Sequence, residues 1–387
     1  MMPAATITGA ATSTTAFVGR AASGPVGQPM TIFSWDEYWR LFGGLSAGSA
    51  ISYQVAGFFQ NGGGAAVILR LSASTVGDGG DPLPLDQAAY LGSPDAGTGI
   101  HALAQADFNI LCIPPDVDGG DTPIAVYRAA AALCVARSAM LIIDSPAAWQ
   151  ERYDAGDIGA IGLDGFGAFW EEEARNSTIY FPRLLAPDPL QGGAVRTFPN
   201  SGYVAGVWAR ADAERGVWKA PAGQEAGVGG ITGLAAEIGN EANALLNARG
   251  INCLRALPVE GPVIWGARTL RGADALGDDY KYVPVRRLRF YLAASLAQGT
   301  QWAAFRANDE ALWSDLREQV AAFLDDLWRQ GALMGAAAHE SYFVKCDAAT
   351  RTAEDMAAGR VKLLAGFAAL KPNEFLTLMI EHQTGQA

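Results

Sequence analysis

The chain has 387 residues, of which 50% are hydrophobic, and it carries a formal net charge of -12 at pH 7. This length and composition allow a sizeable buried core divided among two or three subdomains. Because a negative field repels nucleic acid and anionic lipid, a general DNA-binding role is disfavoured. No apolar run reaches the roughly 18 residues that span a bilayer. The first residues lack the basic start and long apolar core of a secretory signal.

The first part of the chain combines turns with short apolar runs. The runs at residues 16–19 and 66–69 are predicted to be strands. Residues 34–42, between them, are predicted to form a helix in which Ser34 caps the first turn and Glu37 completes a capping box. Two consecutive glycines then end this helix.

The middle of the chain alternates predicted strands with a predicted helix. Residues 72–99 are rich in Gly, Asp and Pro and are expected to form mostly surface loop. Residues 211–233 are again irregular and rich in glycine. The alternation between these two segments indicates an α/β layer. The elements predicted there are a strand at 108–113, a helix at 122–137, and strands at 140–144 and 177–185.

The C-terminal part carries the most regular pattern. Apolar residues recur at helical spacing between Leu312 and Leu327. Asn308 is predicted to cap this helix and Gly331 to end it. A further helix is predicted at 284–297. Strands are predicted at 341–346, 361–367 and 374–381.

The sequence contains no recognisable catalytic constellation. His101 follows a partial dinucleotide-type glycine pattern without the preceding strand that such a motif needs, so a loop entering a short helix is the preferred interpretation. His339 lies in a loop-like segment and His382 in the polar tail, so neither is expected to be a buried general base. No catalytic or cofactor-binding residue is therefore predicted.

The candidate metal ligands also fail on spacing. The acidic turn at 116–121 misplaces a carboxylate and the glycine of a calcium loop, and it is interpreted as a solvated turn that caps the next helix. The three glutamates at 171–173 cannot share one helix face and are interpreted as a solvated helix start. The four cysteines fit no zinc spacing and have apolar neighbours, which predicts small core residues in a reduced cytoplasm. They are Cys112, Cys134, Cys253 and Cys346.

Three short stretches are distinctive although they carry no chemistry. Residues 202–212 read GYVAGVWARAD, residues 215–221 read RGVWKAP, and residues 265–270 read WGARTL. Together they closely resemble the contractile tail sheath family, whose members form the shortening outer cylinder of contractile phage tails, bacteriocin-like tails and extracellular contractile injection systems. The motif positions of this resemblance are Gly202, Arg210, Arg215, Trp218, Lys219, Trp265 and Arg268.

The resemblance extends over residues 12–380, because further pieces occur in family order. They are TSTTAFVGR at 12–20, FGGL at 42–45, FFQNGG at 58–63, LNARGIN at 246–252, FY at 290–291, LWRQGAL at 327–333, FVKCD at 343–347 and LKPNEF at 370–375.

The resemblance implies an α/β fold of mixed α+β type, with mixed sheets flanked by helices and with terminal arm strands that add to the sheets of neighbouring subunits. It implies that subunits stack as six-membered rings around an inner tube and that contraction uses no nucleotide. The implied division is a short arm and first strand at 1–20, an α/β region at 21–260, and a C-terminal sheath domain with its arm at 261–387.

The partners implied by the resemblance are copies of the chain, an inner tube protein, baseplate and terminator cap proteins, and paralogous sheath subunits where these exist. No cofactor, metal, nucleic acid or membrane insertion is implied. Assembly is expected in the cytoplasm, followed by incorporation into a phage-tail-like particle that is released or stays intracellular.

The last predicted strand is expected to be an inter-subunit arm. Its side chains are apolar on both sides, which implies burial on both faces, and the polar chain end that follows can reach a neighbour. The alternative is an ordinary central strand within the monomer. The arm residues are Phe375, Leu376, Thr377, Leu378, Met379 and Ile380.

The N-terminal arm is expected to be short, because the family's additional strand of Pro-Gly-Val-Tyr type is missing ahead of Thr12. At most one short inter-subunit pairing is predicted for it. This fits either a terminal-ring paralogue or a sheath that relies on its C-terminal arm. The short 72–99 loop also indicates a compact member without an extra outward domain. The N-terminal arm residues are Ala5, Thr6, Ile7 and Thr8.

Two other classes of function stay open at this point. A shell or surface-layer protein would polymerise without contracting, and an α/β enzyme would need a site that known motifs do not reveal. The particle type is also open, since phage tails and injection systems use the same sheath, although an injection system or tail-derived particle is the preferred interpretation.

Overall fold

The chain divides into two compact units. The large unit consists of Thr12–Arg286, and the small unit combines Met1–Ala11 with Arg287–Ala387. The boundaries predicted after residues 20 and 260 differ from this division, because the strands on either side of both positions belong to one sheet of the large unit. The computed structural model describes residues 6–72, 84–117, 119–163, 166, 169 and 171–384.

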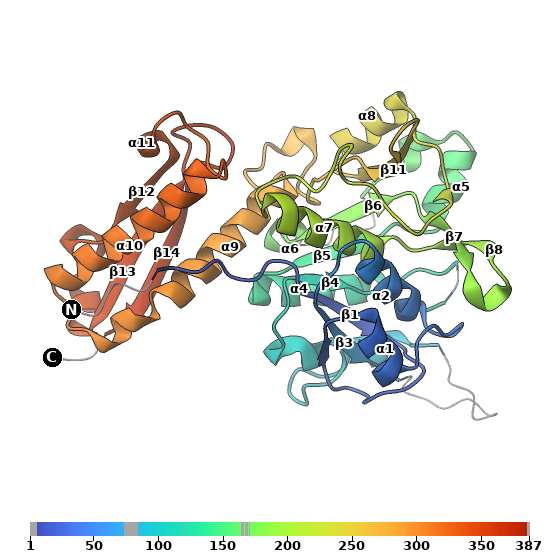
Figure 1. The fold of residues 1–387 in the computed structure, drawn as a ribbon, viewed down its shortest axis with the longest axis horizontal. Coiled ribbons are helices and arrows are strands. Elements are labelled where there is room, and N and C mark those ends of the chain that lie inside the picture. Colours follow the sequence, from blue (N-terminus) through green and yellow to red (C-terminus); the bar gives the residue numbers. More distant parts are fainter. Residues whose placement is uncertain are drawn as a thin grey trace. The chain divides into compact units, whose positions relative to one another are not determined.

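The large unit is built around an eight-stranded sheet (Figure 1). Its inner strands run parallel, and one antiparallel strand lies at each end. Parallel neighbours need crossover connections, which helices supply, so the predicted α/β layer is confirmed. In spatial order the strands are β11 (Gly261–Ile264), β10 (Asn252–Leu257), β6 (Ser177–Phe181), β5 (Met140–Asp144), β4 (Ile110–Cys112), β1 (Thr15–Gly19), β3 (Ala66–Arg70) and β2 (Met30–Ile32).

Helices cover both faces of this sheet. Successive residues of a strand point to opposite faces, so Val18 of β1 joins the core on the α4 side, whereas Phe17 meets Phe58 of α2 edge-to-face with ring centroids 5.5 Å apart. The helices of the large unit are α1 (Trp35–Phe42), α2 (Ala50–Gln60), α3 (Gln87–Leu91), α4 (Ile124–Arg137), α5 (Ala148–Asp154), α6 (Glu171–Arg175), α7 (Ser201–Arg215) and α8 (Asn240–Ala248).

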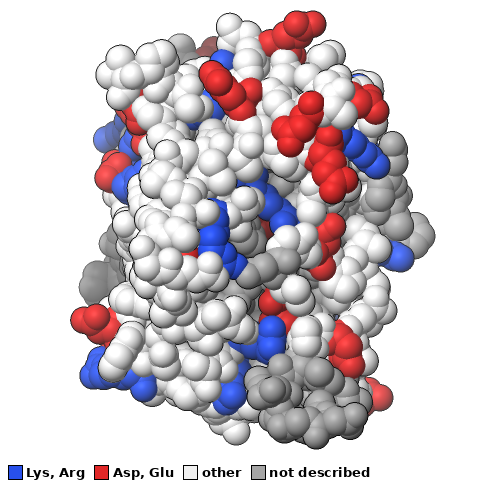
Figure 2. All heavy atoms as spheres, turned by 90° about the vertical axis from the view of Figure 1, so that its right-hand side faces the viewer, with Lys and Arg blue, Asp and Glu red and all other residues white. Residues whose placement is uncertain are grey.

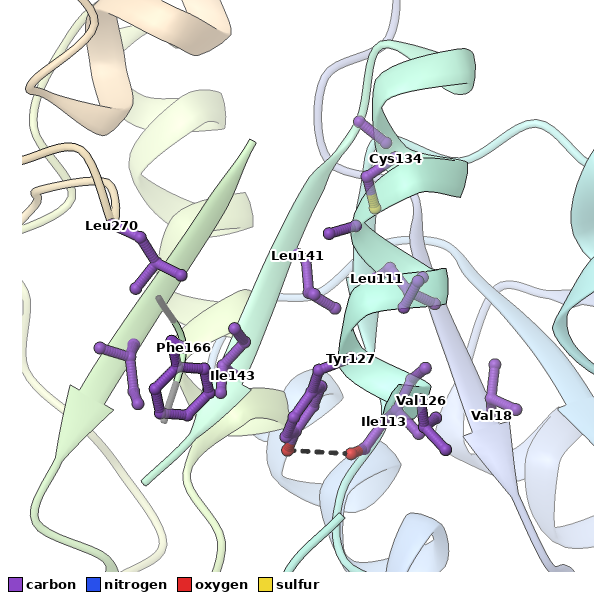
Figure 3. Packing of buried hydrophobic residues seen from close by; sticks show 14 of the residues in the cluster. Val18, Leu111, Ile113, Val126, Tyr127, Cys134, Leu141, Ile143, Phe166 and Leu270 are labelled. Carbon is purple, nitrogen blue, oxygen red and sulfur yellow. Dashed lines mark hydrogen bonds between the residues drawn. The ribbon is translucent and has the colours of Figure 1, made fainter. Parts of the chain in front are cut away.

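The core between α4 and the sheet is closely packed. Figure 3 shows Tyr127 and Cys134 of α4 beside Leu111 and Leu141 of the strands. The Tyr127 hydroxyl donates to the carbonyl of Ile113 at 3.3 Å, so its one polar atom has a partner inside the apolar layer. All four cysteines are buried and unpaired with one another, which confirms that they are core residues.

The Ser34 cap predicted for α1 is confirmed, but the predicted capping box is not, because the Glu37 side chain accepts from the Phe33 amide at 2.7 Å and not from the Ser34 amide. The cap predicted for α10 (Glu310–Arg329) is also corrected. The Ser34 side chain accepts from the Glu37 amide at 3.2 Å, as expected for α1. In α10 the cap is Asp309, which accepts from the Leu312 amide at 2.9 Å, and not Asn308. A carboxylate is favoured there because it also meets the positive end of the helix dipole.

A second, smaller sheet of the large unit lies beside the first and has the order β8–β7–β9. The strand predicted at 177–185 is divided between β6 and β7, with Pro182 between them, because proline has no amide hydrogen to continue a ladder. The segment predicted to be irregular from residue 211 also begins later, since α7 continues to Arg215. The strands are β7 (Leu184–Asp188), β8 (Ala194–Phe198) and β9 (Gly233–Leu234).

The loop predicted at 72–99 contains α3 and the start of a 3₁₀ turn at Gly99–Gln105, while residues 73–83 lie outside the described part of the chain. None of the helices formed by the described residues combines the length and apolar character needed to cross a bilayer.

The small unit consists of an antiparallel three-stranded sheet with helices packed against it (Figure 1). The strands predicted at 341–346, 361–367 and 374–381 are confirmed, and so is the helix predicted at 284–297. Gly331 ends α10 with a left-handed φ of 76°, as predicted. The elements are α9 (Val283–Gly299), α10, α11 (Ala338–Ser341), β12 (Tyr342–Lys345), α12 (Ala353–Ala357), β13 (Arg360–Phe367) and β14 (Leu376–Gln383).

Candidate assembly surfaces

The first motif stretch forms α7 and packs it on α2 at very short range. A Cβ at Gly202 would lie 2.4 Å from the carbonyl oxygen of Gln54, and one at Gly206 would lie 2.5 Å from that of Phe58. The Gly202 amide also donates to the Gln54 side chain at 2.8 Å. These glycines are therefore required for the close approach of the two helices.

The amino end of α7 is capped by a buried carboxylate. Asp144, at the end of β5, accepts from the amides of Asn200 and Ser201 at 2.7 and 2.8 Å and from the Ser201 hydroxyl at 2.7 Å. Burial raises the pKa of Asp144, while these hydrogen bonds and Arg183 act to lower it. The Ser201 hydroxyl is thus part of the hydrogen-bonded cap of α7.

Two motif arginines fix the chain that leaves α7. Arg210 donates to the carbonyls of Asn61 and Gly227 at 3.0 and 2.6 Å. Arg215 pairs with Glu225, ten residues further along the chain. Both guanidinium groups are therefore used inside the fold to hold the glycine-rich segment against the helices.

The segment that follows the second motif stretch pairs with the strand that precedes the third, at the edge of the large sheet. The Gly223 amide donates to the carbonyl of Ile264 at 2.8 Å, and the Val228 amide donates to that of Pro262 at 2.8 Å. The chain that follows Trp218 and Lys219 therefore covers β11, immediately before Trp265. This cover protects a sheet edge that would otherwise be open.

Of the remaining motif residues, Trp265 and Arg268 contact other side chains of the chain, whereas Lys219 is exposed. The Arg255 guanidinium lies 5.4 Å from the ring centre of Trp265. Arg268 pairs with Asp274 at 2.8 Å. Lys219 is exposed. The motif that carries the resemblance thus consists mainly of residues whose packing, hydrogen bonds and ion pairs stabilise the large unit.

The acidic turn at 116–121 does not cap the next helix, and that prediction is wrong. Asp116 accepts from the Arg20 guanidinium at 2.8 Å and from the Leu85 amide at 2.8 Å. The residue that precedes α4 is Pro123, which has no side-chain cap. Asp118 lies outside the described residues. Among the residues that the structure describes, no group of three or more His, Cys, Asp or Glu is arranged to hold a metal ion.

The glutamate run at 171–173 begins α6, as predicted, but it is not merely solvated. Glu172 pairs with Arg175 at 2.6 Å and with Arg286 at 2.5 Å. Arg175 also pairs with the buried carboxylate of Asp278 at 3.0 Å. Burial acts to raise the pKa of Asp278, yet its arginine partners hold that pKa below its ordinary value. The run is therefore part of an ion-pair network within the large unit.

The histidines do not converge on a site. His101 lies in the short 3₁₀ turn, as predicted, and His339 lies in α11. His382 belongs to β14 and not to the tail, because this strand is longer than predicted. Its Nε2 atom lies 2.7 Å from the Thr300 hydroxyl, and burial lowers its pKa.

The predicted C-terminal arm forms β14, which pairs along its whole length with β13 of the same chain. It lies at the edge of its sheet, so it is not a central strand within this chain. Within the single chain only one face of β14 is covered, since Leu378 and Ile380 are buried whereas Thr377 and Met379 are exposed. Side-chain alternation on a sheet covered on one face explains this pattern.

The outer edge of β14 has no strand partner among the described residues. The Thr384 amide donates to the carbonyl of Gly359 at 2.9 Å, which fixes the alternation of the antiparallel ladder. By this alternation, the backbone amides and carbonyls of Thr377, Met379 and Glu381 point away from β13. A row of such groups is a template for pairing with another extended segment.

The N-terminal segment packs on α9 of its own chain. Ile7 is buried against Gly299, where a Cβ would lie 2.7 Å from its side chain. The Ala10 amide donates to the Ser295 hydroxyl at 2.9 Å. Thr6, Ile7 and Thr8 form no strand, and Ala5 lies outside the described residues.

Sequence reasoning missed one surface, the β7–β8 hairpin. Its turn contains Gly192 and Gly193 between two apolar stretches, which is a hairpin signal that was available. Figure 1 shows this hairpin projecting from the large unit.

Two family descriptions match this chain. The phage tail sheath protein central domain matches residues 89–270, and the phage tail sheath C-terminal domain matches residues 277–383. The chain belongs to the phage tail sheath family. A putative prophage major tail sheath protein of Pseudomonas aeruginosa (strain UCBPP-PA14) is 32% identical over 198 residues, which are 49% of this chain and 47% of that protein. The aligned part thus spans about half the length of that relative.

Solved structures of contractile assemblies share the fold. The helical sheath of the anti-feeding prophage in its contracted state has a TM-score of 0.72 and 28% sequence identity, and the match covers 98% of this chain and 95% of that one. A chain in the baseplate structure of the same particle gives the same values. The mixed α/β fold and the sheath resemblance are both confirmed.

Proposed function

We propose that this chain polymerises as stacked six-membered rings around an inner tube and contracts without nucleotide to drive that tube through a target envelope. The observation that carries the proposal is the shared fold with a contracted helical sheath over 98% of the chain. The equal similarity to a chain in a baseplate structure supports a baseplate as one partner. An inner tube protein, a terminator cap and paralogous sheath subunits complete the proposed set of partners.

Contraction in this proposal needs no catalytic site. The acidic residues that were considered as metal ligands take part in ion pairs of the scaffold, for example Asp116 with Arg20 and Glu172 with Arg286, which supports a structural role for them. The energy would come from the assembly itself, with the extended cylinder held by a kinetic barrier until a baseplate releases it. Assembly in the cytoplasm precedes incorporation into the particle.

The outer edge of β14 is the proposed joint between copies. Strand addition supplies main-chain hydrogen bonds to the outward groups of Thr377, Met379 and Glu381. Residues 375–380 therefore accept a neighbour's extended segment in place of being donated as a free arm. A head-to-tail contact of this kind does not close on itself along an axis, so it generates a helical cylinder.

The N-terminal arm has a minor part in this proposal. Within the described part of this segment, Ile7 is already buried on α9 and the Ala10 amide is already bonded to Ser295. The proposal therefore relies on the C-terminal joint.

Negative-stain electron microscopy of the purified chain tests the function. Tubes or stacked rings are expected. Flat sheets would indicate a shell or surface-layer protein, and separate particles of one size at high concentration would overturn the proposal.

A further inference from the structure

Three methionine side chains of the small unit are exposed to solvent. Met334 is 44% exposed, Met356 is 54% exposed and Met379 is 52% exposed. Met140, inside the large sheet, is fully buried. A peroxide oxidises an exposed thioether to a sulfoxide, which is polar, whereas a buried thioether is shielded from it. Of the three exposed positions, Met379 is the one that lies in β14, the strand of the proposed joint.

Met379 lies in the middle of the outer edge of β14. Its backbone groups point away from β13, as do those of Thr377 and Glu381 on either side. Its side chain lies beside that of Leu364, because the two residues are directly opposite in the β13–β14 ladder and form the kind of pair whose side chains come closer together. A strand added at this edge would place one of its own residues opposite Met379, so the thioether would then lie between two neighbouring side chains.

Oxidation of this side chain should therefore affect assembly more than folding. In the single chain a sulfoxide at residue 379 keeps contact with water, because the residue is 52% exposed. In the joint the same group would lose much of that water to Leu364 and to the added strand. A polar oxygen that is buried without a hydrogen-bond partner is costly, so the sulfoxide opposes the joint while the small unit stays folded.

We propose that Met379 is a modification site at which oxidation by a peroxide controls assembly. The sulfur lone pair attacks one oxygen of hydrogen peroxide, the O–O bond breaks, an S–O bond forms and water leaves. The sulfur loses two electrons and the peroxide gains them. A methionine sulfoxide reductase, supplied with a thiol reductant, reverses the step and releases the oxygen as water. The inference rests on the proposed function, because it concerns the regulation of the β14 joint.

Thiol oxidation and surface charge do not account for such an effect. All four cysteines are buried, and burial raises the pKa of the Cys346 thiol to about 11, so this thiol stays protonated and weakly reactive at neutral pH. A sulfoxide carries no formal charge, so the net charge of -12 does not change. Figure 2 shows one face of the molecule with acidic and basic side chains mixed over it, and oxidation leaves these charges as they are. The change is therefore one of local polarity.

Oxidation of the unassembled chain with dilute hydrogen peroxide tests the proposal. Peptide mass spectrometry should find one added oxygen on each of the three exposed methionines and almost none on Met140. The thermal midpoint of the oxidised chain should stay close to that of the untreated chain. The concentration at which half of the chain sediments as tubes or rings should rise about fivefold or more, because the joint buries the sulfoxide. Treatment with methionine sulfoxide reductases should return it to the untreated value.

Matched variants assign the effect to one sulfur atom. The double variant Met334→Leu with Met356→Leu keeps Met379, so peroxide should raise its sedimentation concentration as much as that of wild type. Met379→Leu lacks the sulfur, so the ratio of its treated to its untreated concentration should stay near one, whatever the untreated value is.

Wild-type particles that are assembled before treatment give an independent measurement. Met379 should be oxidised more slowly in these particles than in the free chain, because the added strand covers its side chain. This measurement needs no substitution, so it decides the question even where Met379→Leu does not assemble.

The outcomes distinguish this inference from the proposed function. Untreated wild-type chain that forms no tubes or rings overturns both. Chain oxidised at Met379 that assembles as well as untreated chain, or an equal rise in Met379→Leu, overturns the inference and leaves the function intact. A large fall in the thermal midpoint on oxidation also overturns it, because the sulfoxide would then act on the fold. Equal rates of Met379 oxidation in free and assembled chain overturn it as well.

Discussion

The sheets of the two units differ in how much of their surface is covered by the chain itself. The eight-stranded sheet of the large unit has helices on both faces, and the chain after α7 covers its β11 edge. The three-stranded sheet of the small unit exposes Thr377 and Met379 on one face and leaves β14 without an outer partner among the described residues. The β11 edge of the large sheet is thus covered within the chain, whereas β14 of the small unit has no outer strand partner among the described residues.

Because of this difference, we expect substitutions in the two sheets to affect different properties of the protein. A substitution inside the large sheet should act on the folded state of the single chain. A substitution on the outer edge of β14 should act on the association of chains and leave each chain folded. Four experiments test this distinction, from the largest expected effect to the smallest.

Met379→Pro should abolish tubes and rings. Its amide points away from β13, so proline removes an outward donor without breaking the ladder within the chain. The thermal midpoint of the unassembled variant should stay close to that of wild type, and electron microscopy should show single particles.

Leu378→Pro is the matched control for this change. Its amide faces β13, so it should destabilise the small unit itself. Tubes formed by Met379→Pro would show that the outer edge of β14 is not the joint.

Leu141→Ala should lower the free energy of unfolding of the large unit by about 2–5 kcal/mol. The side chain is fully buried between β5 and α4, and its removal leaves a cavity. Chemical denaturation measures the change. Met379→Ala, at a position that is 52% exposed, should cost less than about 0.5 kcal/mol. Equal costs at the two positions would contradict the comparison of the two sheets.

Tyr53→Phe should cost about 1–3 kcal/mol, because it removes a hydrogen bond to the buried carboxylate of Asp188. Tyr342→Phe removes a hydroxyl that donates at 3.2 Å to Asp325, which is less buried, and its cost should be smaller. Denaturation of both variants measures this difference, and a larger loss for Tyr342→Phe would contradict it.

Acidification should weaken the small unit slightly through His382. Burial lowers its pKa from the ordinary value of 6.5, so the unfolded chain binds this proton more readily than the folded chain does. The stability that His382 contributes is fully present above the unfolded pKa and is lost as the pH falls through 6.5 toward the folded pKa. Thermal midpoints measured from about pH 8 to about pH 5 should fall less for His382→Gln than for wild type. An identical pH profile in the variant would exclude this contribution.

Local patterns predicted much of the secondary structure and the family. The helical spacing between Leu312 and Leu327 correctly predicted α10, and the Ser34–Glu37 pair correctly predicted the start of α1. Such signals are local, because capping and periodicity depend on residues within a few positions of one another. The glycines of the first motif also carried the resemblance, and their spacing reflects the close approach of α7 to α2.

Long-range contacts determined the position of β14 in its sheet and the packing of the N-terminal segment, which local sequence patterns did not predict. Residues 374–381 are apolar on both sides, but only the fold determined that β14 is an edge strand with one exposed face. Similarly, Ile7 joins the small unit through a contact with Gly299, far away along the chain. The sequence by itself determined the family and elements with strong local signals, such as α1 and α10. Only the tertiary structure decided which strand lies at the edge of its sheet and which of its faces is exposed, because both depend on segments that are distant in sequence.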